Sequence, residues 1–331
     1  MLNEVLKDYF NRQIRMYEIG EEGIEKLRKS HVAVVGVGGL GSFSSLLLAL
    51  NGVGRLTLIE PDIVELSNLN RQILYYPMDV WLFKAEAAYN RLKRYAPHVD
   101  IRAYPVLLTA RTIEMYLKDV DIILDGLDNM SSRYLVNRFS IKHRVPYVFT
   151  GVGGFEYNIS FIHPPETPCL ECFYRNMDDK YVVRYIRERG IINFTVGHVA
   201  SIQVAEAVKY LIGLSPSLRG RLLIGDMKSL SPEYMDVKKD PECNACASPT
   251  YDEFTSKFYG VDTVVIDLEK DIDLDDVINR IGKDLILVRR GELGVVFSKD
   301  KAVVGVSKYG TLVIKNAENH FVNEIISKVL D

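Results

Sequence analysis

Short apolar runs alternate with longer amphipathic stretches along most of the chain, and the clearest example of this pattern lies near the N-terminus. The apolar, β-branched run at 31–37 is typical of a buried strand, the small and apolar stretch at 42–50 is typical of a helix, and 55–60 indicates a second strand. A glycine-rich turn separates the first strand from the helix. Strand, glycine turn, helix and strand in this order predict a nucleotide-binding βαβ unit.

The alternation of strands and helices continues to residue 224 and predicts an α/β fold with a doubly wound, mostly parallel, Rossmann-like sheet. Helices are expected at 1–30, 84–95, 111–118, 131–144 (capped by Ser131) and 194–214, and strands at 99–108, 120–124, 146–151, 155–163 and 221–224. The segment 175–190 is strongly charged and has little apolar periodicity. We therefore expect a long mobile crossover there, with an amphipathic surface helix as the alternative.

The pattern changes at about Gly260. Strand-like runs and helical patterns then follow in the order strand 261–268, helix 273–281, strands 285–288, 294–298, 302–306 and 311–315, and helix 319–330. This order predicts a small α+β domain over 261–331, separate from a large domain over 1–260. The small domain contains no catalytic motif that we identify, so its role stays open.

Composition and charge narrow the class of protein. The chain has 331 residues, of which 47% are hydrophobic and 26% are charged, as expected for a globular protein with a sizeable core. Its formal net charge of −3 argues against a general nucleic-acid or membrane-surface binder. No signal peptide is visible in the first ten residues, and no apolar run approaches the length of a membrane span. We therefore expect a cytoplasmic protein with neither a nucleic-acid nor a membrane partner.

The glycine turn and the acid that follows it are the first candidate site residues. The turn contains Gly36, Gly38, Gly39 and Gly41. Glycines let the backbone approach a phosphate, and the helix N-terminus behind them offers free N–H groups and the positive end of a dipole. Glu60 ends the second strand, about twenty residues further on, where it can accept hydrogen bonds from ribose hydroxyls.

Arg71 and Lys84 distinguish an ATP site from a dinucleotide site. The βαβ unit alone fits both. A nicotinamide dinucleotide needs no pair of cations beyond the ribose acid, whereas the charge of a triphosphate must be neutralised. The cations therefore favour ATP.

Three separated motifs resemble the ThiF/MoeB adenylyltransferases, the bacterial and archaeal relatives of ubiquitin-activating enzymes. The motifs are the GxGGLG turn at 36–41, the Asp-x-Val-Glu-Leu-Ser-Asn-Leu-x-Arg-Gln run at 62–72 and Asn-Arg-Gln-Ile at 11–14. The resemblance covers roughly residues 8–250 and identifies that part as an adenylation domain with N-terminal helices and zinc knuckles. It implies a homodimer that uses ATP and Mg²⁺ to adenylate the C-terminal glycine of a ubiquitin-like sulfur-carrier protein ending in Gly-Gly.

The resemblance also implies roles for individual residues. Asp128 would hold Mg²⁺ on ATP, Arg71 and Lys84 would clamp the phosphates, and Arg12 would reach the triphosphate of the neighbouring subunit. Asn68 and, more weakly, Gln72 are expected to contact the nucleotide. The alternatives are a helix cap for Asp128, surface cations for Arg71 and Lys84, and a helix-surface salt bridge for Arg12. Asp125, next to the proposed metal ligand, would share that work or brace the turn.

All four cysteines occur in two Cys-x-x-Cys pairs, Cys169 with Cys172 and Cys243 with Cys246. Four thiolates suit a tetrahedral Zn²⁺ ion, and the arrangement resembles the structural zinc site of the same family. Two unrelated pairs of buried thiols, or a redox pair, are the alternatives. A closed four-sulfur site has no open position, so we assign it to stability.

The sequence departs from the family pattern in two places. Many relatives carry a cysteine before the helix that starts here at Phe194, but residues 181–193 contain none. The ribose acid is Glu60, where the family usually has aspartate. The first departure argues against an activating enzyme that forms a thioester with its partner. A nicotinamide-dependent oxidoreductase and a non-enzymatic nucleotide-binding scaffold are two further candidate functions, and the pathway that the carrier serves stays open.

Overall fold

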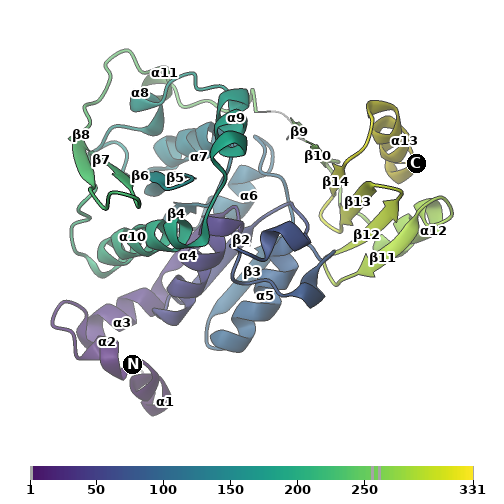
Figure 1. Cartoon of the computed structure of the whole chain (residues 1–331). Helices are drawn as coiled ribbons and strands as arrows, with labels where there is room; N and C mark the ends of the chain where they lie inside the picture. The colour runs from purple at the N-terminus through teal and green to yellow at the C-terminus, as the bar shows by residue number, and fades with distance from the viewer. Residues whose placement is uncertain (1–2, 255–256, 260–261, 331) are drawn as a thin grey trace.

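The computed structural model describes residues 3–254, 257–259 and 262–330, and these residues form two β-sheets with their own helices (Figure 1). The eight-stranded sheet lies in the N-terminal part and the six-stranded sheet in the C-terminal part. The expected α/β fold with a small C-terminal α+β domain is confirmed. The expected boundary between residues 260 and 261 lies outside the described residues.

The large sheet has the strand order β3-β2-β1-β4-β5-β6-β7-β8. Its strands are β1 (His31–Val35), β2 (Arg55–Ile59), β3 (Asp100–Tyr104), β4 (Ile122–Asp125), β5 (Tyr147–Gly153), β6 (Glu156–Ile162), β7 (Arg221–Asp226) and β8 (Glu233–Asp236). Strands β1 to β5 are parallel, and β6 to β8 pair antiparallel. The strand order reverses between β1 and β4, which is where open α/β sheets bind ligands. Strand β8 was not expected.

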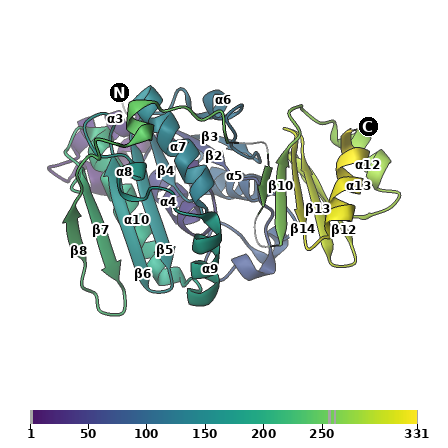
Figure 2. The same ribbon diagram turned by 90° about the horizontal axis from the view of Figure 1, so that it is seen from above.

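Helices cover both faces of this sheet, as its alternating side chains require (Figure 2). The helices of the large domain are α1 (Glu4–Tyr9), α2 (Asn11–Ile14), α3 (Gly20–Lys29), α4 (Gly39–Leu50), α5 (Lys84–Tyr95), α6 (Ile113–Leu117), α7 (Met130–His143), α8 (Leu170–Phe173), α9 (Asp179–Arg189), α10 (Asn193–Ile212) and α11 (Asn244–Ala247). Val32 and Val34 belong to the core with α3, α4, α5 and α10, whereas Ala33 and Val35 belong to the core with α6 and α7. Every residue of β1 is thus buried.

The segment expected to be a mobile crossover is helical instead, so that prediction is wrong and its alternative holds. Helix α9 begins after Asp178, whose side chain accepts a hydrogen bond from the Lys180 backbone N–H. Arg184 and Glu188 form an (i, i+4) ion pair on its exposed side. The charges that obscured the apolar periodicity therefore belong to a solvated helix face, which is typical of a surface helix.

The cap of α7 also differs from the prediction. The helix starts at Met130, and Asn129 is its N-cap, with Oδ1 accepting a hydrogen bond from the Ser132 backbone N–H at 2.8 Å. Ser131 lies inside the first turn. Asparagine and serine cap helices about equally well, so residue type alone did not distinguish them.

Helix length and composition bear on membrane insertion. The longest helix, α10, has 20 residues and carries the charged residues Glu206 and Lys209 in its second half. None of the helices in the described part of the chain combines the length and apolar character of a membrane span.

The small domain is an antiparallel sheet with two helices on one face (Figure 1). Its strands follow the order β11-β12-β13-β14-β10-β9. The elements are β9 (Lys257–Tyr259), β10 (Thr263–Asp267), α12 (Leu274–Ile281), β11 (Ile286–Arg290), β12 (Gly294–Lys299), β13 (Ala302–Ser307), β14 (Thr311–Lys315) and α13 (Asn319–Leu330). From β10 onward this is the expected sequence of elements, and β9 is the addition.

The opposite face of the small sheet packs against the large domain. Val265, Val296 and Val313 form one apolar cluster with Ile63 and Phe83 of the large domain. Polar contacts flank the cluster: Arg111 pairs with the buried Asp267 at 2.7 Å, and both Glu86 carboxylate oxygens accept backbone N–H groups from 292 and 293. The face that a free sheet would expose to water is therefore covered by its neighbour.

Candidate nucleotide site

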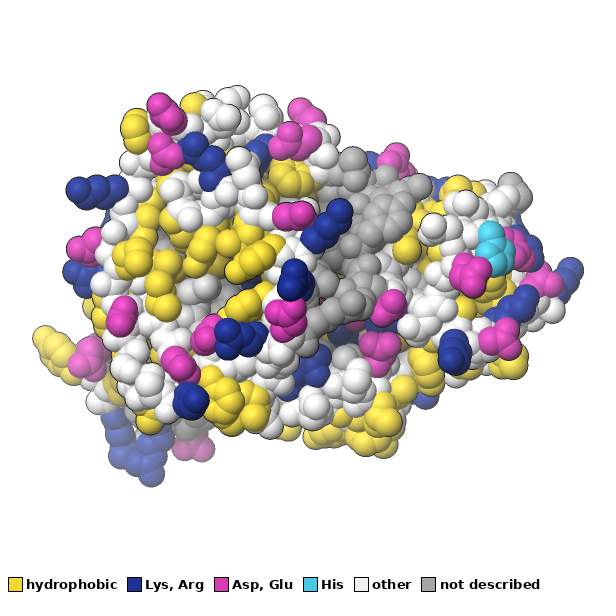
Figure 3. Space-filling model, turned by 45° about the horizontal axis from the view of Figure 1, so that its top comes forward, with side chains coloured by type: hydrophobic (Ala, Val, Ile, Leu, Met, Phe, Trp, Pro, Cys, Tyr) yellow, Lys and Arg dark blue, Asp and Glu magenta, His cyan; other side chains and the backbone are white. Residues whose placement is uncertain are grey.

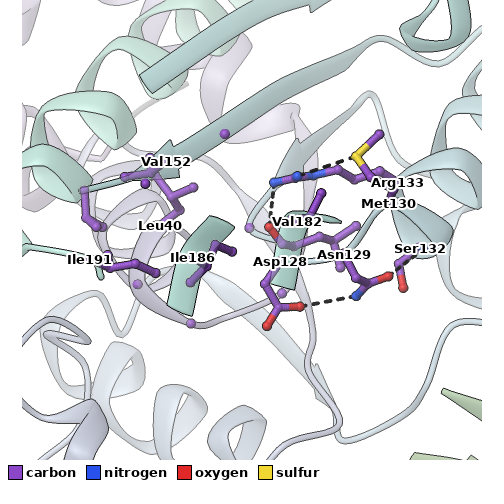
Figure 4. A pocket seen from close by; sticks show the side chains of 18 of the residues that line it. Leu40, Asp128, Asn129, Met130, Ser132, Arg133, Val152, Val182, Ile186 and Ile191 are labelled. Carbon is purple, nitrogen blue, oxygen red and sulfur yellow. Dashed lines mark hydrogen bonds between the residues drawn. The ribbon is translucent and has the colours of Figure 1, made fainter. Parts of the chain in front are cut away.

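A pocket of about 1030 Å³ opens at the carboxyl ends of β1, β2 and β4. It brings together most of the predicted site residues, which are Gly36, Gly38, Gly39, Glu60, Asn68, Arg71, Gln72, Lys84 and Asp128. Figure 4 shows Asp128, Asn129 and Ser132 on one side of the pocket and the apolar side chains of Leu40, Val152, Ile186 and Ile191 on another. A wall with both polar and apolar parts suits a nucleotide, which combines charged phosphates with a base.

The glycine turn is held by close backbone packing. Gly36 has φ +84°, a left-handed conformation that favours glycine, and a Cβ there would lie 2.5 Å from the Gly126 carbonyl oxygen. A Cβ on Gly41 would lie 1.9 Å from the Gly36 carbonyl oxygen. Gly41 does not line the pocket; it lets α4 approach β1 closely, so that the turn and the helix N-terminus lie side by side at the pocket.

Glu60 braces the turn from the end of β2. Its Oε2 accepts a hydrogen bond from the Val37 backbone N–H at 2.8 Å, and its Oε1 accepts one from the Asp62 backbone N–H at 2.9 Å. The carboxylate therefore links the glycine turn to the 61–72 loop. Glu60 lines the pocket, and its contact with a ribose stays a prediction.

The 61–72 loop forms the next part of the wall. Asn68 is buried and its Oδ1 accepts a hydrogen bond from the Glu65 backbone N–H at 3.1 Å, which closes the short turn Leu66–Asn68. Arg71 donates from Nη1 to the Ser67 carbonyl oxygen at 2.8 Å. Gln72 is 4% exposed, and its Oε1 has no hydrogen-bond partner among the described residues. A buried, unpaired acceptor at a pocket wall needs a donor, and a bound ligand would supply one.

Lys84 begins α5 and points to the same wall. Its Nζ lies 2.6 Å from Asp62 Oδ2, and the lysine is 6% exposed. Although burial acts in the opposite direction, the carboxylates of Asp62 and Glu60 raise the pKa of Lys84 above its usual value. The lysine is therefore a fixed positive charge at neutral pH. The alternative of a surface cation does not hold for Lys84.

The turn after β4 separates a structural acid from an accessible one. Asp125 is fully buried, and its Oδ2 accepts hydrogen bonds from Arg133 Nε at 3.0 Å and from the Tyr147 hydroxyl at 2.6 Å. Asp125 therefore braces the turn. Asp128 is exposed at the pocket, where its Oδ1 accepts from Asn129 Nδ2 at 3.2 Å. Its carboxylate is the one available to a metal ion, and the cap of α7 is Asn129.

Helix α9 closes a further side of the pocket. Tyr181, Val182, Tyr185 and Ile186 line it. The helix is attached to the start of α7 through Asp179, whose Oδ1 accepts from the Ser131 backbone N–H at 3.1 Å and whose Oδ2 accepts from the Ser131 hydroxyl. The sequence of this segment did not reveal the contact, because its charged pattern predicts a mobile crossover.

Arg12, like Gly41, is a predicted nucleotide-site residue that the structure leaves outside the pocket. It lies exposed on α2 and is not among the pocket residues of its own chain. This position leaves its predicted role dependent on a second subunit.

Residues from the small domain complete the wall. Thr263, Val265 and Lys315 line the pocket, and none was a predicted site residue. Lys315 Nζ lies 2.6 Å from Asp62 Oδ1 and 3.0 Å from Glu65 Oε2. One feature of the sequence could have identified Lys315: it is a lysine at an inward-facing position of an otherwise apolar strand. Such a lysine indicates a buried partner of opposite charge.

The four cysteines meet at one point, although two sequence segments supply them. Their Sγ atoms all lie within 4.8 Å of one another, with 3.6 Å between Cys169 and Cys243 and 3.7 Å between Cys172 and Cys246. Sulfurs held about 2.3 Å from a central Zn²⁺ in a tetrahedron are separated by roughly 3.8 Å. The cluster therefore fits one zinc ion, and the alternative of two unrelated thiol pairs does not hold.

The comparisons with known proteins agree with this geometry. The model of the ThiF family matches residues 10–245. The chain is 36% identical over 252 residues to a sulfur carrier protein adenylyltransferase of Thermus thermophilus, a match that spans 74% of this chain and 93% of the relative. It is 31% identical to the SAMP-activating enzyme E1 of Haloferax volcanii over 79% of this chain and 96% of that protein.

Solved structures show the same fold at lower identity. The crystal structure of E. coli MccB with ATP aligns with a TM-score of 0.61 at 20% identity, covering 69% of this chain and 70% of MccB. The family match ends before the small domain begins.

We predict that the cysteine cluster holds one structural zinc ion per chain. Replacing Cys169 with serine leaves an incomplete site, and the metal-binding energy that is lost is also folding energy. The Cys169→Ser protein should lose its zinc and unfold at a midpoint lower by roughly 5 °C or more. Metal analysis and thermal unfolding measure the two effects.

A chelator provides the matched control for this prediction. It should lower the unfolding midpoint of the unaltered protein and leave that of the Cys169→Ser protein unchanged, because the variant has no metal to lose. Freshly purified protein that contains no zinc would contradict the prediction.

Proposed function

The chain belongs to the ThiF family, and from this premise we propose that it adenylates the C-terminal carboxylate of a ubiquitin-like sulfur-carrier protein with ATP and Mg²⁺. The observation that carries the proposal is the pocket, which combines a glycine turn, a buried lysine, an arginine and an accessible aspartate at one switch point. Relatives named as a sulfur carrier protein adenylyltransferase and a SAMP-activating enzyme support this substrate class.

ATP has suitable partners around the pocket. The glycine turn and the N-terminus of α4 would receive the phosphates, and Glu60 would accept hydrogen bonds from the ribose. Gln72 Oε1, buried and without a partner among the described residues, is free to accept a hydrogen bond from the nucleotide. Asp128 would hold Mg²⁺, which draws charge from the phosphate oxygens when bound.

The reaction needs no side-chain base. The attacking group is a carboxylate that is already ionised at neutral pH. One of its oxygens forms a bond to the α-phosphorus of ATP, and the bond from that phosphorus to the bridging oxygen of the β-phosphate breaks. The products are an acyl adenylate on the carrier and pyrophosphate. Catalysis then consists of positioning and charge stabilisation.

The cations of the pocket supply that stabilisation. Lys84 is buried and Arg71 lies on the loop beside it, so both can face the β- and γ-phosphates. Negative charge develops on the departing pyrophosphate, and positive groups beside it lower the energy of that state. A nicotinamide-dependent oxidoreductase would give these cations and the zinc cluster no role.

A carrier protein needs a surface next to the pocket. Figure 3 shows hydrophobic side chains gathered on one face of the large domain, with Lys and Arg side chains beside them. Large hydrophobic side chains are exposed around the antiparallel part of the sheet, among them Phe155, Ile224, Tyr234 and Met235. We place the body of the carrier on this side, with its Gly-Gly tail entering the pocket beneath α9.

We predict that Asp128→Asn lowers carrier-dependent exchange of labelled pyrophosphate into ATP by at least about a hundredfold, because the charge that holds Mg²⁺ is lost. Asp271→Asn, which removes an exposed acid outside the pocket, is the matched control and should exchange at the normal rate. Full activity in a folded Asp128→Asn protein would contradict the metal assignment. Exchange that is absent from the unaltered protein with every carrier would favour the nucleotide-binding scaffold.

We predict that Arg12 acts across a homodimer. A mixed dimer of Arg12→Ala and Asp128→Ala subunits has one site with both groups and one with neither. Random mixing of the two inactive proteins should therefore restore about a quarter of normal exchange activity. Arg15→Ala, which removes an exposed arginine just after α2, should be active by itself. Mixed dimers that remain inactive would show that Arg12 does not complete the neighbouring site.

We predict that the reaction stops at the acyl adenylate on this enzyme. A thioester needs a thiolate near the activated glycine, and all four cysteines lie in the metal-binding cluster. Enzyme, carrier and MgATP should therefore give no adduct on a non-reducing denaturing gel or in intact mass spectra. An adduct that a reducing agent cleaves would favour the thioester-forming alternative and remove one cysteine from the zinc site.

A further inference from the structure

Lys315 is a buried cation that the small domain contributes to the nucleotide pocket. The residue is 5% exposed, and its Nζ contacts two carboxylates of the 61–72 loop, Asp62 at 2.6 Å and Glu65 at 3.0 Å. It lies outside the part of the chain that matches the family model, which ends at residue 245. No role follows for it from the proposed reaction alone.

The position of Lys315 is determined by the alternation of β14. Side chains two residues apart share a face of a strand, so Thr311, Val313 and Lys315 all face the large domain. The Thr311 hydroxyl oxygen accepts a hydrogen bond from the Leu107 backbone N–H at 3.2 Å, and Val313 packs in the cluster with Phe83. These two contacts fix β14 against the large domain. They therefore determine where Lys315 lies, independently of its charge.

Asp62 is shared by two lysines. Lys84 binds Oδ2 and Lys315 binds Oδ1, each at 2.6 Å. Although burial acts in the opposite direction, the two lysines hold the pKa of Asp62 well below its usual range. The carboxylate is therefore ionised, and its Oδ1 is buried although the side chain as a whole is 25% exposed. With only one lysine beside it, Asp62 would hold that lysine, because a carboxylate largely removed from water is destabilised when it loses its partner.

We propose that Lys315 is a positioning residue of the nucleotide site: it keeps Asp62 paired, so that Lys84 can turn to a bound phosphate without leaving a partly buried carboxylate uncompensated. The inference rests on the proposed nucleotide site. It gives the small domain a function, because the affinity for ATP then depends on a side chain that is docked from outside the family domain. Lys315 itself need not touch the nucleotide.

The test is the dissociation constant of MgATP, measured by calorimetry without a carrier. Lys315→Met should weaken binding at least about tenfold, since Lys84 must then leave Asp62 unpaired to reach a phosphate. Lys315→Arg keeps the charge and should recover most of the affinity. In the double variant Asp62→Asn, Lys315→Met there is no carboxylate to compensate, and binding should again be tighter than in Lys315→Met.

A second bridge between the domains provides the matched control. Arg111 pairs with Asp267 on the same small sheet but outside the pocket. Arg111→Met weakens the docking of the small domain and should lower the unfolding midpoint without changing the affinity for MgATP. The recovery in the double variant separates a charge effect from a loss of packing, which Asp62→Asn cannot restore.

The outcomes are distinct. Normal MgATP affinity in Lys315→Met, or a double variant that binds as weakly as Lys315→Met, overturns the inference. If Lys315→Met does not fold, Lys315→Gln replaces it, alone and together with Asp62→Asn: the single variant must bind MgATP at least about tenfold more weakly and the double variant more tightly than the single one, and any other result overturns the inference. Unaltered protein that binds MgATP but catalyses no pyrophosphate exchange overturns the proposed reaction and leaves the inference about Lys315 standing.

Discussion

The nucleotide site depends on direct backbone packing between the turn after β1 and the turn after β4. The Gly36 carbonyl oxygen faces Gly41 and Gly126, where any Cβ would come within 2.1 Å of it. Three glycines at this contact let α4 begin immediately behind β1 and let the Asp128 turn lie beside the glycine turn. The proposed phosphate-binding backbone and the proposed metal ligand share one pocket because no side chain separates these two turns.

Charge balance is the second constraint on the pocket. Glu60, Asp62 and Glu65 line one wall, and the cations Lys84 and Lys315 contact the same loop. Acids at this density would repel a triphosphate, but the two lysines pair with them. The proposed role of Lys315 makes the charge balance of the pocket depend on the docking of the small domain, which connects the role of that domain to the strength of its interface. Val313 and Phe83 at that interface therefore serve the site as well as the fold.

Rigid elements surround the chemistry on the remaining sides. Asp125, Arg133 and Tyr147 form a buried network that holds the turn before Asp128, so the proposed metal ligand does not depend on a flexible loop. The cysteine cluster, our proposed zinc site, joins two segments 74 residues apart near α8 and α11, away from the pocket. Stability and chemistry are thus assigned to separate parts of the large domain, which agrees with a closed metal site that takes no part in the reaction.

The sequence by itself determined the order of nearly all elements, the glycine turn, the family and the grouping of the four cysteines, because these follow from local periodicity and from residues at fixed spacing. It did not reveal that α9 is a helix, since solvated charges hid the apolar face that closes the pocket. It also did not reveal the pairing of Asp62 with Lys315. The two residues are 253 positions apart, and only the docking of one sheet against the other domain brings their charges together. Contacts of this kind depend on how whole elements pack, which no local pattern encodes.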